Sequence, residues 1–137
     1  MASEKHQIIA GIVARKMKEM GYSIVAFDGK SFWIGEKEIH IPLALVKHRP
    51  DLIGINANNE ICIGEAKTTI DITTKRTRRQ LIDFSNIKSK SDREVMFFVG
   101  TPLSGKQLIL NIIQEVGLKN KNNLVIITVP DILLEKK

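Results

Sequence analysis

Two short apolar runs, separated by a polar stretch, constrain the fold of this chain more than any other feature. Residues 52–55 and 61–63 are rich in isoleucine, and β-branched residues favour a half-buried pleated surface. The stretch 56–60 between them is rich in asparagine, which tolerates the left-handed backbone of a tight turn. The pattern predicts a β-hairpin with a three-residue loop, residues 57–59. In that register three pairs face each other: Ile55 with Ile61, Ile53 with Ile63, and Asp51 with Glu65.

Side chains alternate between the two faces of a strand, so the hairpin places its ionisable residues on one apolar face. That face carries, in order, Asp51, Ile53, Ile55, Ile61, Ile63, Glu65 and Lys67, while the other, which we expect to face solvent, carries mostly small residues. Charges on an apolar face are unfavourable unless they neutralise each other or bind a cation. The neighbouring carboxylates of Asp51 and Glu65 therefore predict either a hard divalent cation with oxygen ligands or a partly buried ion pair with Lys67.

The same residues resemble a known family signature. Pro50-Asp51, thirteen intervening residues and Glu65-Ala66-Lys67 are similar to the motif of the PD-(D/E)xK nuclease superfamily, which includes archaeal Holliday junction resolvases, type II restriction enzymes and RecB-like nucleases. The resemblance implies that Asp51, Glu65 and the Ala66 carbonyl bind one or two Mg²⁺ ions, for which Mn²⁺ can substitute. It also implies that Lys67 positions or activates the attacking water.

A second resemblance lies further along the chain. Gln80-Leu-Ile-Asp-Phe84 is similar to the Gln-x-x-x-Tyr element of RecB-like members, with phenylalanine in place of tyrosine. This implies that Gln80 supports the metal-bound water or a phosphate, and the alternative is an ordinary polar position on a helix. On the helix predicted for residues 74–90, Arg76 falls on the same stripe as Gln80 and Phe84.

The charge of the chain indicates a polyanionic partner. The formal net charge is +6, and Lys75, Arg76, Arg78 and Arg79 lie within five residues directly after the hairpin. We expect these four side chains to contact DNA phosphates, with salt-sensitive binding as a consequence. The alternative is a solvated face of a helix.

The remaining pattern predicts a single domain over residues 1–137, which is long enough for one sizeable core. Period and turn residues predict a helix at 3–21, strands at 22–27, 94–99 and 124–129, and a helix at 104–117, with short extended runs at 32–34 and 38–41. The order is typical of an α/β, restriction-endonuclease-like fold: a mixed β-sheet flanked by helices. No signal peptide or membrane span is evident and one cysteine allows no internal disulfide, so we expect a soluble cytoplasmic protein.

Other ionisable residues carry weaker signals. Glu4 is the acid nearest the start of the first helix, and we expect it on the surface. His40 and His48 have no second histidine or cysteine at zinc-like spacing, so we expect both to be solvated, although His48 is close enough to Asp51 to contact phosphate.

A competing motif is present at residues 100–106. Its sequence, Gly-Thr-Pro-Leu-Ser-Gly-Lys, matches the G-x-x-x-x-G-K of a P-loop, but Gln107 follows where that motif needs a hydroxyl for magnesium. A helix-capping turn is the alternative.

The resemblance to the PD-(D/E)xK superfamily implies a metal-dependent DNA endonuclease that is structure-selective, as junction resolvases are, and homodimeric because symmetric substrates need paired sites. Two other functions stay open. One is a non-catalytic nucleic-acid-binding module, and the other is a P-loop-type nucleotide hydrolase.

Overall fold

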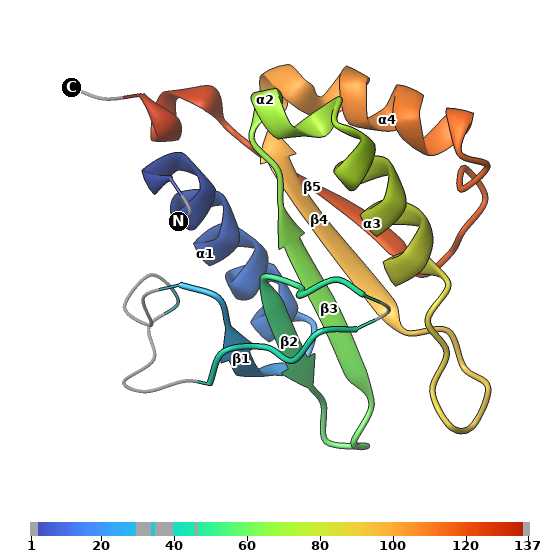
Figure 1. Cartoon of the computed structure of the whole chain (residues 1–137). Coiled ribbons are helices and arrows are strands. Elements are labelled where there is room, and N and C mark those ends of the chain that lie inside the picture. The colour runs from blue at the N-terminus through green and yellow to red at the C-terminus, as the bar shows by residue number, and fades with distance from the viewer. Residues whose placement is uncertain (1–2, 30–33, 35–39, 46, 136–137) are drawn as a thin grey trace.

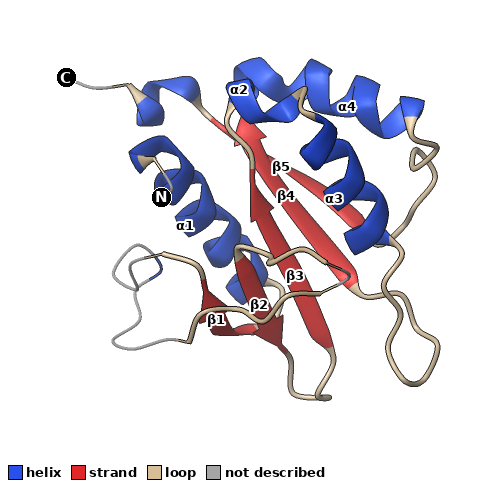
Figure 2. Ribbon diagram, in the orientation of Figure 1, coloured by secondary structure: helices blue, strands red, loops and turns tan. Residues whose placement is uncertain are grey.

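The computed structural model describes residues 3–29, 34, 40–45 and 47–135. Its helices and strands are, in order, α1 (Glu4–Glu19), β1 (Ser23–Phe27), β2 (Leu52–Ile55), β3 (Ile61–Ala66), α2 (Thr69–Ile72), α3 (Lys75–Ser85), β4 (Met96–Pro102), the 3₁₀ turn η2 (Leu103–Gly105), α4 (Lys106–Glu115), β5 (Leu124–Val129) and the 3₁₀ turn η3 (Asp131–Leu134) (Figure 1). The described strands form one sheet in the order β1-β2-β3-β4-β5. β1, β2 and β3 pair antiparallel, and β3, β4 and β5 pair parallel. The predicted mixed sheet flanked by helices is therefore confirmed (Figure 2).

The β2–β3 hairpin has the predicted register. Ile55 pairs with Ile61 and Ile53 with Ile63. Asn59 adopts a positive φ of 62°, and the Asn56 side chain accepts backbone hydrogen bonds from Asn58 and Glu60 across the loop. The geometry of this loop sets the register of the hairpin, and with it which residues lie opposite each other at the end away from the loop.

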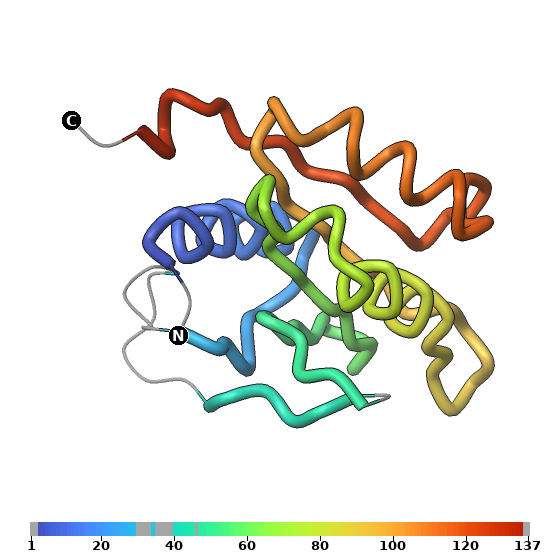
Figure 3. The backbone as a smooth tube through the Cα atoms, turned by 45° about the horizontal axis from the view of Figure 1, so that its top comes forward, coloured from blue at the N-terminus to red at the C-terminus, as the bar shows by residue number. Residues whose placement is uncertain are grey.

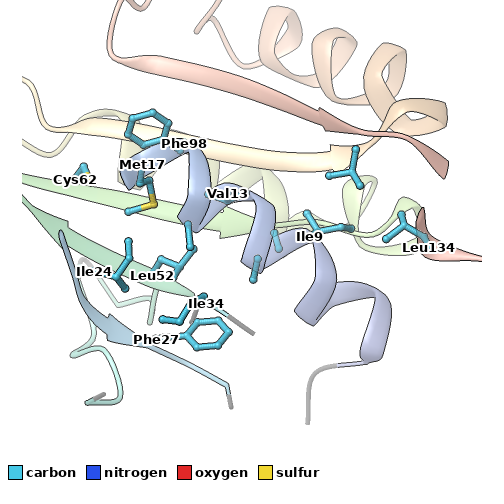
Figure 4. Close-up of a cluster of buried hydrophobic side chains, with 14 residues drawn as sticks. Ile9, Val13, Met17, Ile24, Phe27, Ile34, Leu52, Cys62, Phe98 and Leu134 are labelled. Carbon is cyan, nitrogen blue, oxygen red and sulfur yellow. The ribbon is translucent and has the colours of Figure 1, made fainter. Parts of the chain in front are cut away.

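The face of the sheet with small residues is not exposed to solvent, which corrects the sequence expectation. Helix α1 covers it, with Ile9, Val13 and Met17 buried against the strands (Figure 4). A Cβ on Gly64 would lie 2.9 Å from the Met17 sulfur, and one on Gly100 would lie 2.3 Å from a Val13 methyl. The small side chains suggested a solvent-exposed face. In the structure they instead allow helix α1 to pack close to the backbone of the sheet.

Substituting Gly100 with alanine is expected to lower the free energy of unfolding by about 1–3 kcal/mol. The added methyl meets Val13 and Ile9, whose β-branched side chains are stiff in a helix and cannot swing aside. Urea unfolding of the variant measures the loss. The double variant Val13→Ala, Gly100→Ala is expected to lose less unfolding free energy than the two single variants lose in sum. A loss equal to that sum would show that the two sites do not touch.

The opposite face of the sheet is covered by the later helices. Leu81 and Phe84 of α3, Ile109 of α4 and Ile72 of α2 pack against Ile63, Phe97 and Val99. Alternation along β4 separates the two cores, since Phe98 belongs to the α1 side. Figure 3 shows α1 and α3 well separated, in keeping with this division. Helix α3 ends at Ser85, five residues before the predicted end, and a loop follows in which Asp92 has a positive φ of 63°.

Residues 40–45 and 47–49 form an irregular segment, here called the strap, that precedes β2. It begins at His40, whose carbonyl accepts a 2.8 Å hydrogen bond from the Phe27 amide. It turns back at a bridge between Leu45 and His48. His48 is half-buried rather than solvated, because its Nε2 lies 2.8 Å from Asp83 Oδ2 on α3. His40 is exposed as expected, and most of the extended runs predicted at 32–34 and 38–41 lie outside the described residues.

Candidate active site

Asp51 and Glu65 lie side by side, each just at the end of the β2–β3 ladder. The Asp51 amide donates to Glu65 Oε1 at 2.8 Å, and the Ala66 amide donates to Asp51 Oδ2 at 2.8 Å. The carboxylates therefore continue the backbone pairing of the hairpin beyond the last pair, Leu52 and Gly64. This mutual bonding holds both acids side by side where the backbone pairing of the hairpin stops.

Lys67 is the residue directly after β3, and it adds a cation to the cluster of acids. Its amide donates to the Gly100 carbonyl at 2.9 Å, which extends the parallel pairing with β4. Its ammonium lies 3.5 Å from Glu65 Oε2 and donates to Gln80 Oε1 of α3. Lys67 and Gln80 are 8% and 2% exposed. Gln80 was predicted to support a water or a phosphate, and the structure places its carbonyl oxygen against Lys67.

His6 is a site residue that the sequence analysis missed. Its Nε2 lies 3.1 Å from Asp51 Oδ2, and its Nδ1 is buried without a hydrogen-bond partner in the described part of the chain. Glu4 is exposed, as expected. The signal for His6 was its position on the buried stripe of α1, three residues before Ile9 and seven before Val13.

The electrostatics of the cluster are dominated by burial and by like charge. Burial, and then the adjacent Asp51 carboxylate, raise the pKa of Glu65 well above its ordinary value, and Lys67 offsets only part of this rise. Burial lowers the pKa of His6, but the hydrogen bond and charge of Asp51 outweigh that effect, so the pKa of His6 ends above its ordinary value. The Asp51 carboxylate therefore raises the pKa of both neighbours, Glu65 and His6.

These side chains lie in a pocket of about 600 Å³ between the strap and α3. Its lining residues are His6, Asp28, Ala44, Arg49, Asp51, Glu65, Lys67, Asp71, Thr74, Arg76, Thr77 and Gln80. All four residues predicted as catalytic are therefore brought together. Arg49, directly before the Pro-Asp pair, is a second residue that the sequence analysis did not select.

The four predicted phosphate-binding residues occupy different positions. Arg76 lines the pocket. Lys75 and Arg79 are exposed on the same helix. Arg78 lies 2.5 Å from Glu115 Oε2 of α4, so its guanidinium is engaged by another helix. Among the four, Arg76 is best placed to contact a group that enters the pocket.

Residues 100–106 do not form a phosphate-binding loop. Gly100, Thr101 and Pro102 belong to strand β4, and Lys106 is the first residue of α4. A Cβ on Gly105 would lie 2.6 Å from Ile72 and 2.8 Å from Thr101 Oγ1. Both glycines are required by close packing, which explains the match to the P-loop pattern without a nucleotide. The predicted cap is also different, because Ser104 Oγ bonds Asp131 at 2.8 Å.

No protein-family model matches this chain, and no curated protein matches it at a significant level. Among solved structures, it is similar to a repair endonuclease from Pyrococcus abyssi, with a TM-score of 0.47 and 11% sequence identity. The alignment covers 95% of this chain and 48% of that one, so the chain spans about half the length of the endonuclease. The function proposed below does not rest on this likeness. In the described part of the chain, every helix is too short or too polar to cross a lipid bilayer.

Proposed function

We propose that the protein is a metal-dependent phosphodiester hydrolase that cuts DNA. The observation that carries the proposal is the convergence of Asp51, Glu65 and Lys67 in one pocket, with Gln80 against the ammonium group. Two acids and a lysine at this spacing resemble the PD-(D/E)xK motif, and here they lie together at one end of the β2–β3 hairpin.

The donors present suit a hard divalent cation. Within the described residues, no group of three or more histidine, cysteine, aspartate or glutamate side chains is arranged to hold a metal ion. Mg²⁺ typically binds through one or two carboxylates and keeps several waters, which Asp51 and Glu65 can accommodate. Burial and then the Asp51 carboxylate raise the pKa of Glu65, and a bound cation would offset both effects by stabilising the ionised form.

The backbone offers a third oxygen ligand. The Lys67 amide points to β4, whereas the Ala66 amide points to Asp51. The amide and carbonyl of one residue lie on the same edge of a strand, so the Ala66 carbonyl shares the edge that faces Asp51. Mg²⁺, or Mn²⁺ in its place, would be held by Asp51, Glu65 and this carbonyl. When bound, the cation supplies Lewis acidity and positive charge beside the phosphate.

The chain's own cations act on the substrate. Lys67 offsets charge on the phosphate and orients the attacking water, and Gln80 and Glu65 hold its ammonium in place. Arg76 binds the backbone without reading sequence. Structure selectivity and a homodimer that presents two sites to a symmetric substrate complete the proposal.

Cleavage of supercoiled, linear and four-way DNA, with Mg²⁺ and with chelator, tests this function. We expect cuts that require Mg²⁺ or Mn²⁺. Salt-sensitive DNA binding with no cuts under any metal would identify a non-catalytic nucleic-acid-binding module instead. ATP turnover without DNA cleavage would point to a nucleotide hydrolase.

Replacing Gln80 with leucine is expected to lower kcat about tenfold with little change in KM. The ammonium of Lys67 would lose its closest acceptor and keep Glu65 Oε2, 3.5 Å away. Steady-state cleavage kinetics across a pH series measure the effect, since a displaced ammonium alters the shape of the profile as well as its height. Gln107→Leu, on the exposed surface of α4, is the matched control. A rise in KM with kcat unchanged would contradict the positioning role.

A further inference from the structure

The candidate site is recessed between two walls. Asp51 and Glu65 are 8% and 2% exposed, at the floor of the pocket. The strap contributes Ala44 and Arg49 to one wall, and the first turns of α3 form the other. In Figure 1 the strap, in teal, passes across the sheet below α3. The 2.8 Å contact between His48 Nε2 and Asp83 Oδ2 ties the turn of the strap to α3, so this wall is anchored at its far end.

The depth of Asp51 and Glu65 in the pocket distinguishes between duplex and single-stranded DNA. The phosphates of a duplex lie on the surface of a wide, stiff cylinder whose major groove alone is about 12 Å across. A pocket of about 600 Å³ is of the size that takes a small molecule or one nucleotide, not a cylinder. A single strand is flexible enough to bring one phosphate down to Asp51 and Glu65. The geometry therefore favours a strand that has left its duplex.

Both walls carry an arginine that is free to bind phosphate. Arg49 stands on the strap and Arg76 on α3, and both line the pocket. Neither guanidinium has a hydrogen bond or ion pair within the described residues, although four acids line the same pocket. Arginine forks match phosphate oxygens in two-point geometry. The two side chains can hold the phosphates on either side of the one at the floor.

The outer surface of the strap is apolar beside this charged pocket. Ile41 is 62% exposed and Leu43 is 78% exposed, on either side of the buried Pro42, and Ala44, which lines the pocket, follows directly. A duplex backbone would present sugars and phosphates to these side chains, which gain nothing from such contact. Unpaired bases expose their apolar faces, and burial of exposed aliphatic side chains against such faces is favourable.

We propose that the pocket takes a DNA strand with unpaired bases: its backbone is held between Arg49 and Arg76, and its bases lie against Ile41 and Leu43. This inference rests on the proposed function and specifies its substrate class. In branched DNA, the strand that is cut is then an unpaired arm rather than a paired segment next to a branch.

Binding and cleavage together test the substrate class. Fluorescence anisotropy with chelator present compares a labelled 20-nucleotide single strand, free of secondary structure, with the duplex of the same sequence. Cleavage with Mg²⁺ compares the same two DNAs and a duplex with an unpaired arm. We expect the single strand to bind and to be cut at least about tenfold better than the duplex, and cuts in the third DNA to fall in the arm. Equal or better use of the duplex would overturn the inference.

Two variants assign the preference to the strap. Ile41→Ser with Leu43→Ser is expected to weaken single-strand binding and cleavage about tenfold and to leave hydrolysis of bis(4-nitrophenyl) phosphate unchanged. Ile132→Ser with Leu133→Ser, at exposed apolar positions on η3 outside the pocket, is the matched control and is expected to change neither. Equal losses in the two double variants would refute the role of the strap.

A third variant tests the wall itself. Arg49→Gln is expected to weaken single-strand binding and its salt dependence, whereas Arg15→Gln on exposed α1 is expected to do neither. If no DNA and no small diester is cut, the proposed hydrolase fails; the anisotropy comparison, which needs no cleavage, still decides whether the pocket selects unpaired strands.

Discussion

Replacing Asp51 with asparagine is expected to lower the Mg²⁺-dependent cleavage rate by about a thousandfold or more. The amide oxygen of asparagine can still accept the 2.8 Å hydrogen bond from the Ala66 amide, so the hairpin is expected to stay folded. The negative charge that would hold a cation is lost. Single-turnover cleavage with enzyme in excess measures the rate, and thermal unfolding confirms that the fold is intact.

Asp92→Asn is the matched control for this change. Asp92 is exposed and lies in the loop after α3 with a positive φ of 63°, a conformation that asparagine also adopts readily. Its cleavage rate is expected to equal that of the wild type. Retention of more than about a tenth of the wild-type rate by Asp51→Asn would remove Asp51 from the catalytic set.

Replacing Glu65 with glutamine is expected to abolish cleavage and yet to stabilise the metal-free protein at pH 8. The free energy of unfolding is expected to rise, because glutamine carries no charge that folding has to bury. Burial and the Asp51 carboxylate raise the pKa of Glu65, so the ionised form is disfavoured in the folded state. Glutamine is neutral and can accept the same 2.8 Å hydrogen bond from the Asp51 amide.

The direction of the pH dependence follows from that shift. Above pH 4.5, the ordinary value for glutamate, the unfolded chain releases the proton of Glu65 while the folded protein retains it. The unfolded state then binds fewer protons than the folded one, so the stability of the wild type falls as pH rises until the folded pKa is passed. The gap between wild type and Glu65→Gln is therefore expected to be smallest below pH 4.5 and to grow as the pH rises above that value.

Chemical unfolding at several pH values, with and without Mg²⁺, measures this gap. Added Mg²⁺ is expected to stabilise the wild type at pH 8 and to leave Glu65→Gln unchanged, because the variant lacks one of the carboxylates proposed to bind it. Glu19→Gln, at an exposed position of α1, is expected to follow the wild type at every pH. Parallel curves for wild type and Glu65→Gln would contradict the account of the buried charge.

The hairpin could be predicted in detail because its determinants are local. Alternation of side chains and the asparagine-rich loop act over a few residues, and they place Asp51 opposite Glu65 without help from the rest of the chain. The early end of α3 was missed for the opposite reason. Helical pattern continues past Ser85, but the loop that follows turns back to pair Lys88 with Glu94, a contact that no local pattern shows.

The other members of the site, His6 and Arg49, could not be identified from the sequence. His6 reaches Asp51 because α1 packs on the small-residue face of the sheet, a face that sequence pattern alone suggested was solvated. Arg49 belongs to the pocket because the strap crosses toward α3. The contact between His6 and Asp51 has no sequence spacing that a pattern could reveal, since loop closure over tens of residues depends on the packing of the whole chain. Arg49 lies only two residues before Asp51, but no local pattern shows that its side chain lines the pocket.

The sequence by itself determined the mixed α/β fold, the register of the β2–β3 hairpin and the three ionisable groups at its end, because strand alternation and turn geometry are short-range properties. Tertiary structure alone decided which helix faces Asp51, which arginines enter the pocket and how deep the acids lie. Those features depend on how closely α1 approaches the glycines of the sheet and on where the strap meets α3, and both are settled by packing between segments far apart in the chain.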